Sequence, residues 1–259
     1  MLNDWNLLYL CAMNLLIDQL SVGYGKHIIQ SALCLSARAG EMVCLLGTNG
    51  CGKSTLLRTV AGLQPPVSGS ISVCGQSLSS LSAQERSRLL SLVLTERLAL
   101  ENTLVVDIVS MGRYPYADLL GGLSRKDDSV VWQVMEQTDL LPLRNRCFNS
   151  LSDGEKQRVL LAKALAQQTP VILLDEPTAH LDLPGRVRTF TLLQKMAHEQ
   201  QKTVLVSTHD LDIALQMADT LWLMAPCKGV IVGSPAELLQ TSVFIDLFGQ
   251  EVAPLLKRL

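Results

Sequence analysis

The residues best suited to chemistry in this chain of 259 residues form a glycine-rich run from Gly47 to Thr55. The run reads G-T-N-G-C-G-K-S-T and fits G-x-x-x-x-G-K-[ST], the pattern of a phosphate-binding loop. Glycine lets successive N–H groups point at one anion, and the helix that follows adds the positive end of its dipole. Lys53 can reach the β- and γ-phosphates, and the Ser54 hydroxyl can bind Mg²⁺. The spacing therefore predicts a nucleotide site.

A second candidate group lies at the ends of two apolar runs further along the chain. Residues 171–174 are continuously apolar, which is typical of a parallel strand covered on both faces, and Asp175 and Glu176 follow them. Ligands bind at the carboxyl ends of such strands, so Asp175 is placed to hold Mg²⁺ and Glu176 to polarise an attacking water. His209 follows the next apolar strand, 203–207, and is expected to contact the γ-phosphate. The alternatives are an acidic turn and a purely structural histidine.

The elements around these residues predict an α/β fold with a mainly parallel sheet. Strands are expected before the phosphate loop at 15–22 and 28–36, and after it at 71–73. They favour a small antiparallel sheet beside the parallel one. Residues from about 92 to 165 read as mainly helical and interrupt the α/β pattern. A last helix is expected to begin at Pro235.

Composition narrows the class of protein. Apolar residues make up 48% of the chain and the formal net charge is −2, so the sequence lacks the basic footprint usual for nucleic-acid binding. The apolar stretch 7–17 is too short to span a bilayer, and no signal peptide is apparent, so we expect the protein to stay inside the cell. The seven cysteines form no C-x-x-C pair and are expected to be reduced thiols. Cys51 lies near Lys53, whose charge could lower its pKa, although a small filler residue is the favoured interpretation.

Read in order, these segments resemble the ATP-binding subunit of an ABC transporter from about residue 15 to residue 239. The matching segments are 47–55 with the Walker A motif, 151–155 (L-S-D-G-E) with the LSGGQ signature, 171–176 with Walker B, 179–182 with the D-loop, His209 with the switch histidine and Tyr24 with the aromatic ring under adenine. The resemblance implies a phosphate-loop NTPase fold with an ABC ATPase domain at 15–240, which contains a helical subdomain at about 92–165. It also implies an N-terminal extension at 1–14 and a C-terminal tail at 241–259.

The resemblance further implies ATP and Mg²⁺ as cofactors, with Lys53, Glu176 and His209 as catalytic residues. The implied nucleotide-binding residues are Tyr24, Gly47, Thr48, Asn49, Gly50, Cys51, Gly52, Lys53, Ser54, Thr55, Ser152, Asp153, Gly154, Glu155 and Asp182. Ser54, Asp175 and Thr95 are the implied metal ligands. Thr95 stands where the family has its Q-loop glutamine, and Glu96 is the alternative for that position.

In this family two copies sandwich two ATP molecules, each held by the Walker motifs of one copy and the signature of the other. The implied partners are a second copy, integral membrane permease subunits and, indirectly, a substrate-binding protein, with no nucleic acid. The implied location is the cytoplasmic face of the inner membrane, where the permease would hold the protein. The residues agree, because Ser152 and the free N–H groups that open the helix 155–166 can bind an anion. A single copy would leave that site without its phosphate.

Three departures from the family pattern stand out. Asp153 and Glu155 replace a glycine and a glutamine of the signature, which adds negative charge near a bound γ-phosphate. The Q-loop glutamine is replaced as described, and Thr48 replaces the usual proline.

Two further segments resemble importers of iron–siderophore, haem and cobalamin. They are 112–116 (G-R-Y-P-Y), followed by Leu123 and Ser124, and 233–237 (G-S-P-A-E). One alternative is a soluble ABC ATPase acting on nucleic acid. That class inserts long coiled coils between the Walker A lysine and the signature, whereas here Lys53 and Ser152 are 99 positions apart (152 − 53) without sustained heptads. A nucleotide-binding regulator with lost catalysis is the other alternative.

Overall fold

The fold is described from a computed structural model, which places residues 13–94, 102–118, 120–179, 181–226 and 229–250. Its centre is a six-stranded sheet in which five neighbouring strands are parallel and only the edge strand β10 is antiparallel. In sheet order the strands are β10 (Gly229–Gly233), β9 (Thr220–Ala225), β3 (Met42–Gly47), β8 (Thr203–Ser207), β7 (Val171–Asp175) and β6 (Leu90–Val93). The mainly parallel core predicted from the apolar runs is confirmed.

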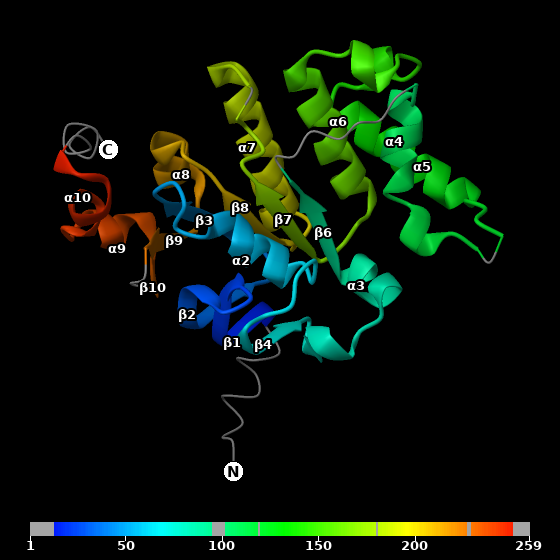
Figure 1. Ribbon diagram of the computed structural model, residues 1–259. Helices are drawn as coiled ribbons and strands as arrows, with labels where there is room; N and C mark the ends of the chain where they lie inside the picture. Colours follow the sequence, from blue (N-terminus) through cyan, green and yellow to red (C-terminus); the bar gives the residue numbers. More distant parts are fainter. Residues whose placement is uncertain (1–12, 95–101, 119, 180, 227–228, 251–259) are drawn as a thin grey trace.

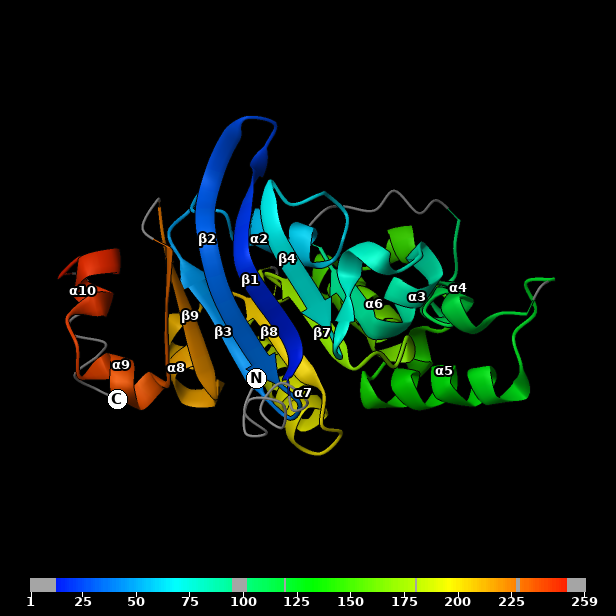
Figure 2. The ribbon, with the colours of Figure 1, turned by 90° about the horizontal axis from the view of Figure 1, so that it is seen from below.

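A second, antiparallel sheet lies against one face of this core, as Figure 2 shows. Its strands, in sheet order, are β2 (His27–Arg38), β1 (Met13–Tyr24), β4 (Ser68–Val73) and β5 (Gln76–Ser77). Helix α2 (Lys53–Val60) packs between the two sheets, where Leu56 and Leu57 are fully buried. This apolar layer holds the start of α2 at the carboxyl end of β3.

Helices form the rest of the molecule. Helix α3 (Ala83–Leu89) precedes β6, and a helical insertion follows it with α4 (Val105–Met111), α5 (Arg125–Gln137) and α6 (Asp153–Ala166) (Figure 1). The remaining helices are α7 (Leu183–His198), α8 (Leu211–Met217), α9 (Pro235–Leu239) and α10 (Val243–Phe248). One continuous apolar core joins the insertion to α7 and α8 on the face of the sheet opposite α2. No helix in the described part of the chain has the length and apolar character needed to cross a membrane.

Local signals in the sequence explain where several helices begin. Capping boxes are present at Ser82, Ser124, Ser152 and Ser234, each with an acidic residue three positions later. Helix α4 begins at Val105 and not earlier, because the residues before it pair with the segment near Cys147. The helix expected to begin at Pro235 is present as α9, but it ends at Leu239 and is not the last helix, because α10 follows it.

Candidate functional site

The phosphate loop leaves the fully buried strand β3 and enters α2. A Cβ atom on Gly47 would lie 2.4 Å from the Met224 carbonyl oxygen, so only glycine fits against β9 at this position. Gly50 and Gly52 have φ values of 77° and 109°, which L side chains rarely adopt. The loop therefore curls as the sequence predicts, and Gly52 stands at the start of α2 without a side chain to cover the helix N–H groups.

Three polar side chains gather at this loop. The Lys53 ammonium is buried and donates hydrogen bonds to the carbonyl oxygens of Gly47 (2.9 Å) and Thr48 (3.3 Å). The Ser54 side chain is exposed at the first turn of α2. Tyr24, at the end of β1, has its hydroxyl 3.3 Å from Thr55 Oγ1, while 57% of the residue remains exposed. An exposed ring therefore stands beside the phosphate loop, where the resemblance places adenine.

Cys51 is a buried filler of the loop and not an activated thiol. It is 1% exposed, and its Sγ atom lies within 2.7 Å of the position of a Cβ atom on Gly47. Burial raises the pKa of the Cys51 thiol, and the opposing effect of Lys53 is smaller. Lys53 therefore lowers this pKa by less than burial raises it, and the possibility that Lys53 activates the Cys51 thiol is wrong.

The two acidic residues after β7 meet residues at the end of β8. Asp175 is 4% exposed, and its Oδ1 accepts a hydrogen bond of 2.6 Å from the Ser207 hydroxyl, its partner in the parallel register. The Glu176 N–H donates to the Ser207 Oγ atom at 3.0 Å, and its backbone has a φ of 48°. His209 Nε2 lies 2.7 Å from Glu176 Oε1. The structure thus brings Asp175, Glu176 and His209 together at the sheet edge as predicted.

Three residues that the sequence did not single out hold this edge together. Ser207 is the first. The other two are Arg186 of α7 and Asp210, which form an ion pair of 2.6 Å. Arg186 also donates a hydrogen bond to the Leu181 carbonyl oxygen (3.0 Å). The only available signal for Ser207 was its place at the end of a strand next to the Asp175 strand. Nothing in the sequence pattern pairs Arg186 with Asp210.

The D-loop aspartate, Asp182, caps α7, because its Oδ1 accepts a hydrogen bond of 2.9 Å from the Gly185 N–H. Together with Arg186 it fixes the turn that leads from β7 to α7.

The signature forms the exposed tip of α6. Ser152 is its N-cap, and the Glu155 Oε2 atom accepts hydrogen bonds from the Ser152 N–H (2.8 Å) and hydroxyl (2.9 Å). These bonds, with help from Arg146 and Arg158, lower the pKa of the Glu155 carboxyl, so it is ionised at neutral pH. Asp153 lies 3.6 Å from Lys156 in an ion pair on the same turn. The helix tip therefore carries an acidic side chain where the family has glutamine.

The phosphate loop and the signature line two different cavities. The first, of about 290 Å³, is lined by loop residues 46–49, Thr208 and His209, together with Leu211 and Phe248. The second, of about 670 Å³, lies between α6 and α7 and includes the signature residues 152–155 and Asp182. Among the described residues, the two cavities share no lining residue. Thr95, Glu96 and His180 lie outside the described residues.

Comparison with known proteins decides the family. A family model described as ABC transporter matches residues 31–179, more than half of the chain. The chain belongs to this family. The ferric enterobactin transport ATP-binding protein of Escherichia coli K12 is 32% identical to this ABC ATPase over 232 residues, 90% of this chain and 86% of the relative. The cobalamin import ATP-binding protein of Halobacterium salinarum is 38% identical over 218 residues, 84% of this chain and 54% of the relative.

Solved structures agree with the fold. The structure of cbiO1 from Clostridium perfringens, part of the ABC transporter complex cbiONQ, superposes on this ABC ATPase with a TM-score of 0.74. The two are 27% identical, and the match covers 91% of this chain and 94% of that one. The protein is therefore an ATP-hydrolysing enzyme of the ABC transporter family. These matches support neither the nucleic-acid alternative nor the regulator alternative.

Proposed function

We propose that two copies of this ATPase enclose two ATP molecules and power a separate membrane permease that imports an iron–siderophore, haem or cobalamin. The observation that carries the two-copy arrangement is the separation of the two cavities. The phosphate loop lines one and the signature lines the other, so one chain offers two half-sites that face different spaces. A second copy can bring its signature to the first copy's phosphate loop, and the reverse pairing follows by symmetry.

The residues at the loop support Mg²⁺ together with the nucleotide. Ser54 and Asp175 supply a hydroxyl and a carboxylate oxygen, which are the ligands that this hard cation takes alongside phosphate oxygens and water. Thr95 is the third proposed ligand. A magnesium ion held by these residues would offset the negative charge of the phosphates. Lys53, now bonded to the loop carbonyls, is placed to turn toward the same phosphates.

Hydrolysis is assigned to the pair formed by Glu176 and His209. The Glu176 carboxylate is 30% exposed at the sheet edge, so it can accept a hydrogen bond from a water molecule and take its proton. His209, 2.7 Å from Glu176, orients this carboxylate and is the proposed contact to the γ-phosphate. Tyr24 is proposed to lie against adenine. The signature residues 152–155 and Asp182 would complete the site of the second copy.

The partners and the location are proposed from the relatives. The names of the two curated relatives place them in transport of ferric enterobactin and import of cobalamin. The segments 112–116 and 233–237 favour the same importer group. We therefore propose a peripheral protein at the cytoplasmic face of the inner membrane, held by permease subunits that receive their cargo from a substrate-binding protein.

The test is the Glu176→Gln substitution. It keeps the size of the side chain and removes the proposed base, so turnover is expected to fall by about 10²–10⁴-fold while ATP still binds. Size-exclusion chromatography of the variant with ATP and Mg²⁺ should then show a dimer that the wild type does not accumulate. Unchanged hydrolysis would contradict the assignment of Glu176, and a variant that stays monomeric with bound ATP would contradict the two-copy arrangement.

A further inference from the structure

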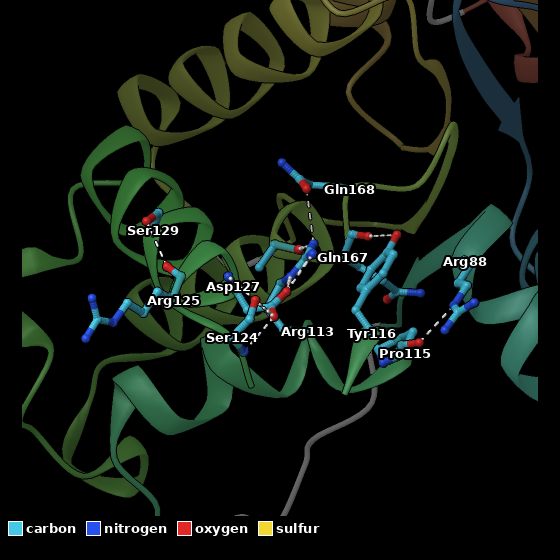
Figure 3. A network of polar contacts seen from close by, with 11 residues as sticks. Arg88, Arg113, Pro115, Tyr116, Ser124, Arg125, Asp127, Ser129, Gln167 and Gln168 are labelled. Atoms are coloured by element: carbon cyan, nitrogen blue, oxygen red, sulfur yellow. Dashed lines mark hydrogen bonds and ion pairs between the residues drawn. The ribbon is translucent and has the colours of Figure 1, made fainter. Parts of the chain in front are cut away.

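A buried ion pair in the helical insertion holds the end of α6 that is opposite the signature (Figure 3). Arg113 Nε donates to Asp127 Oδ1 at 2.9 Å, and the two side chains are only 5% and 7% exposed. Its Nη1 donates to the carbonyl oxygen of Ala166, the last residue of α6, at 2.7 Å. The guanidinium also lies over the Tyr116 ring, 4.1 Å from its centre. One side chain thus ties α5, the turn after α4 and the end of α6 together.

The same point is fastened to the core by Gln167. Its backbone carbonyl accepts a hydrogen bond of 2.9 Å from the Tyr116 hydroxyl. Its side-chain amide donates to the carbonyl oxygens of Leu90 (2.8 Å) and Ser87, which belong to β6 and α3. Gln167 therefore connects the insertion on one side with the edge of the core sheet on the other. We call Arg113, Tyr116 and Gln167 the clip.

Gly112 explains why this clip can form. A Cβ atom on Gly112 would lie 2.2 Å from the Lys163 carbonyl oxygen, so the end of α4 touches the backbone of α6. Only glycine permits that approach, and it places Arg113 within reach of the last turn of α6. The segment 112–116, which the mechanism does not use, thereby acquires a physical role.

The geometry of α6 makes its C-terminal anchor important. The helix has 14 residues and is about 21 Å long, with the signature at one end and the clip at the other. Cavities of about 670 Å³ and 410 Å³ are both lined by residues of α6, so parts of its surface are not packed against the core. A rotation of about 5° about the clip would move the signature by about 2 Å. A misplacement of about 1 Å can already cost about 10²-fold in rate.

We propose that Gln167 and Tyr116, supported by Arg113, are positioning residues that hold α6 on β6 and thereby align Ser152 with the nucleotide of the second copy. The inference rests on the proposed two-copy site. It requires that loss of the clip weakens the meeting of the two copies and leaves nucleotide binding by each phosphate loop intact.

The test uses Gln167→Leu and Tyr116→Phe, each introduced into the full chain that carries Glu176→Gln. Titration with a fluorescent ATP analogue should give the same affinity as the Glu176→Gln reference within about two-fold. The ATP concentration at which half of the protein is dimeric should rise, by about ten-fold for Gln167→Leu, which loses two hydrogen bonds, and less for Tyr116→Phe, which loses one. Analytical ultracentrifugation measures this concentration.

Tyr114→Phe is the matched control. Tyr114 lies two residues before Tyr116, is 59% exposed, and its hydroxyl makes no hydrogen bond with the described residues, so its variant should behave as the reference does. A merely structural clip would lower thermal stability and leave the dimerisation of folded protein unchanged.

If both clip variants dimerise at the same ATP concentration as the Glu176→Gln reference, the inference about the clip is overturned while the two-copy function stands. A reference chain that stays monomeric with bound ATP would overturn the two-copy function and the inference with it. If Gln167→Leu does not fold, Tyr116→Phe decides the question, because it removes one hydroxyl and keeps the ring on Arg113.

Discussion

The two proposed half-sites of this ATPase are built in opposite ways. At the sheet edge, Asp175 is buried at the end of β7 and receives a hydrogen bond from Ser207 on the neighbouring strand. At the tip of α6, the Ser152 and Glu155 side chains form a capping box with each other within one exposed helical turn. The first half-site is fixed by the register of parallel strands. The second is fixed mainly by the position of helix α6. Substitutions that remove similar contacts should therefore affect the two half-sites differently.

The largest expected effect comes from Asp127→Asn, which breaks the buried ion pair between Arg113 and Asp127 at the C-terminal end of α6. This change leaves the Arg113 charge without its counter-ion and should lower the free energy of unfolding by about 3 kcal/mol at pH 7. Hydrogen bonding from Ser124, with help from Arg113, lowers the pKa of Asp127 below its ordinary value of 3.8. The stabilisation is therefore present above pH 3.8 and is lost as the pH falls through the lower folded-state value.

Urea denaturation of wild type and Asp127→Asn across pH measures this effect. The gap between their midpoints should be wide at pH 7 and close below pH 3.8. Asp128→Asn is the control, since its side chain is exposed on the same turn. A gap that does not change with pH would show that the charge of Asp127 is not what stabilises the insertion.

A smaller loss of stability, with a direct effect on catalysis, is expected for Ser207→Ala. The variant leaves the buried Asp175 carboxylate and the Glu176 N–H without this partner, at a cost of about 1–3 kcal/mol. Turnover should also fall, by at least about ten-fold, because both acidic residues lose their orientation. Steady-state ATPase assays and urea denaturation measure the two effects. Ser129→Ala removes an exposed hydroxyl that bonds to Arg125 and should change neither.

The smallest effect should come from Glu155→Gln, which sharpens the comparison. Glutamine can still accept the Ser152 hydrogen bonds, but it removes a negative charge from the helix tip. The ATP concentration needed for half dimerisation in the Glu176→Gln background should fall by about two- to five-fold, the size of one charge at a helix end. Glu85→Gln makes the same change in the equivalent capping box of α3, and it should leave the ATP concentration for half dimerisation unchanged. A higher ATP requirement would mean that the carboxylate itself assists closure.

The sequence predicted the sheet-edge half-site well because its pattern is local. The glycine spacing in 47–52 and the apolar runs that end at Asp175 and Ser207 fix both the fold type and the edge where ligands bind. The capping box that starts α3, formed by Ser82 and Glu85, is an equally local pattern. These features need no knowledge of which distant segments touch.

What the sequence left open depends on pairs that are far apart in the chain. Arg113 with Ala166, Arg186 with Asp210, and Gln167 with Leu90 meet only because helices pack in a particular way. Helix α10 was missed because the break after Leu239 carries no strong signal of its own. The roles of Thr95 and Glu96 remain predictions, since both lie outside the described residues.

The separation of the two cavities has a consequence for how the enzyme works at low abundance. In the proposed two-copy arrangement, free copies must meet before either can complete a site, so their activity should rise more steeply than in proportion to protein concentration. Two copies tethered on one permease would instead face each other at a high effective concentration, in the millimolar range for short tethers. The membrane partner would then switch hydrolysis on simply by keeping the pair together.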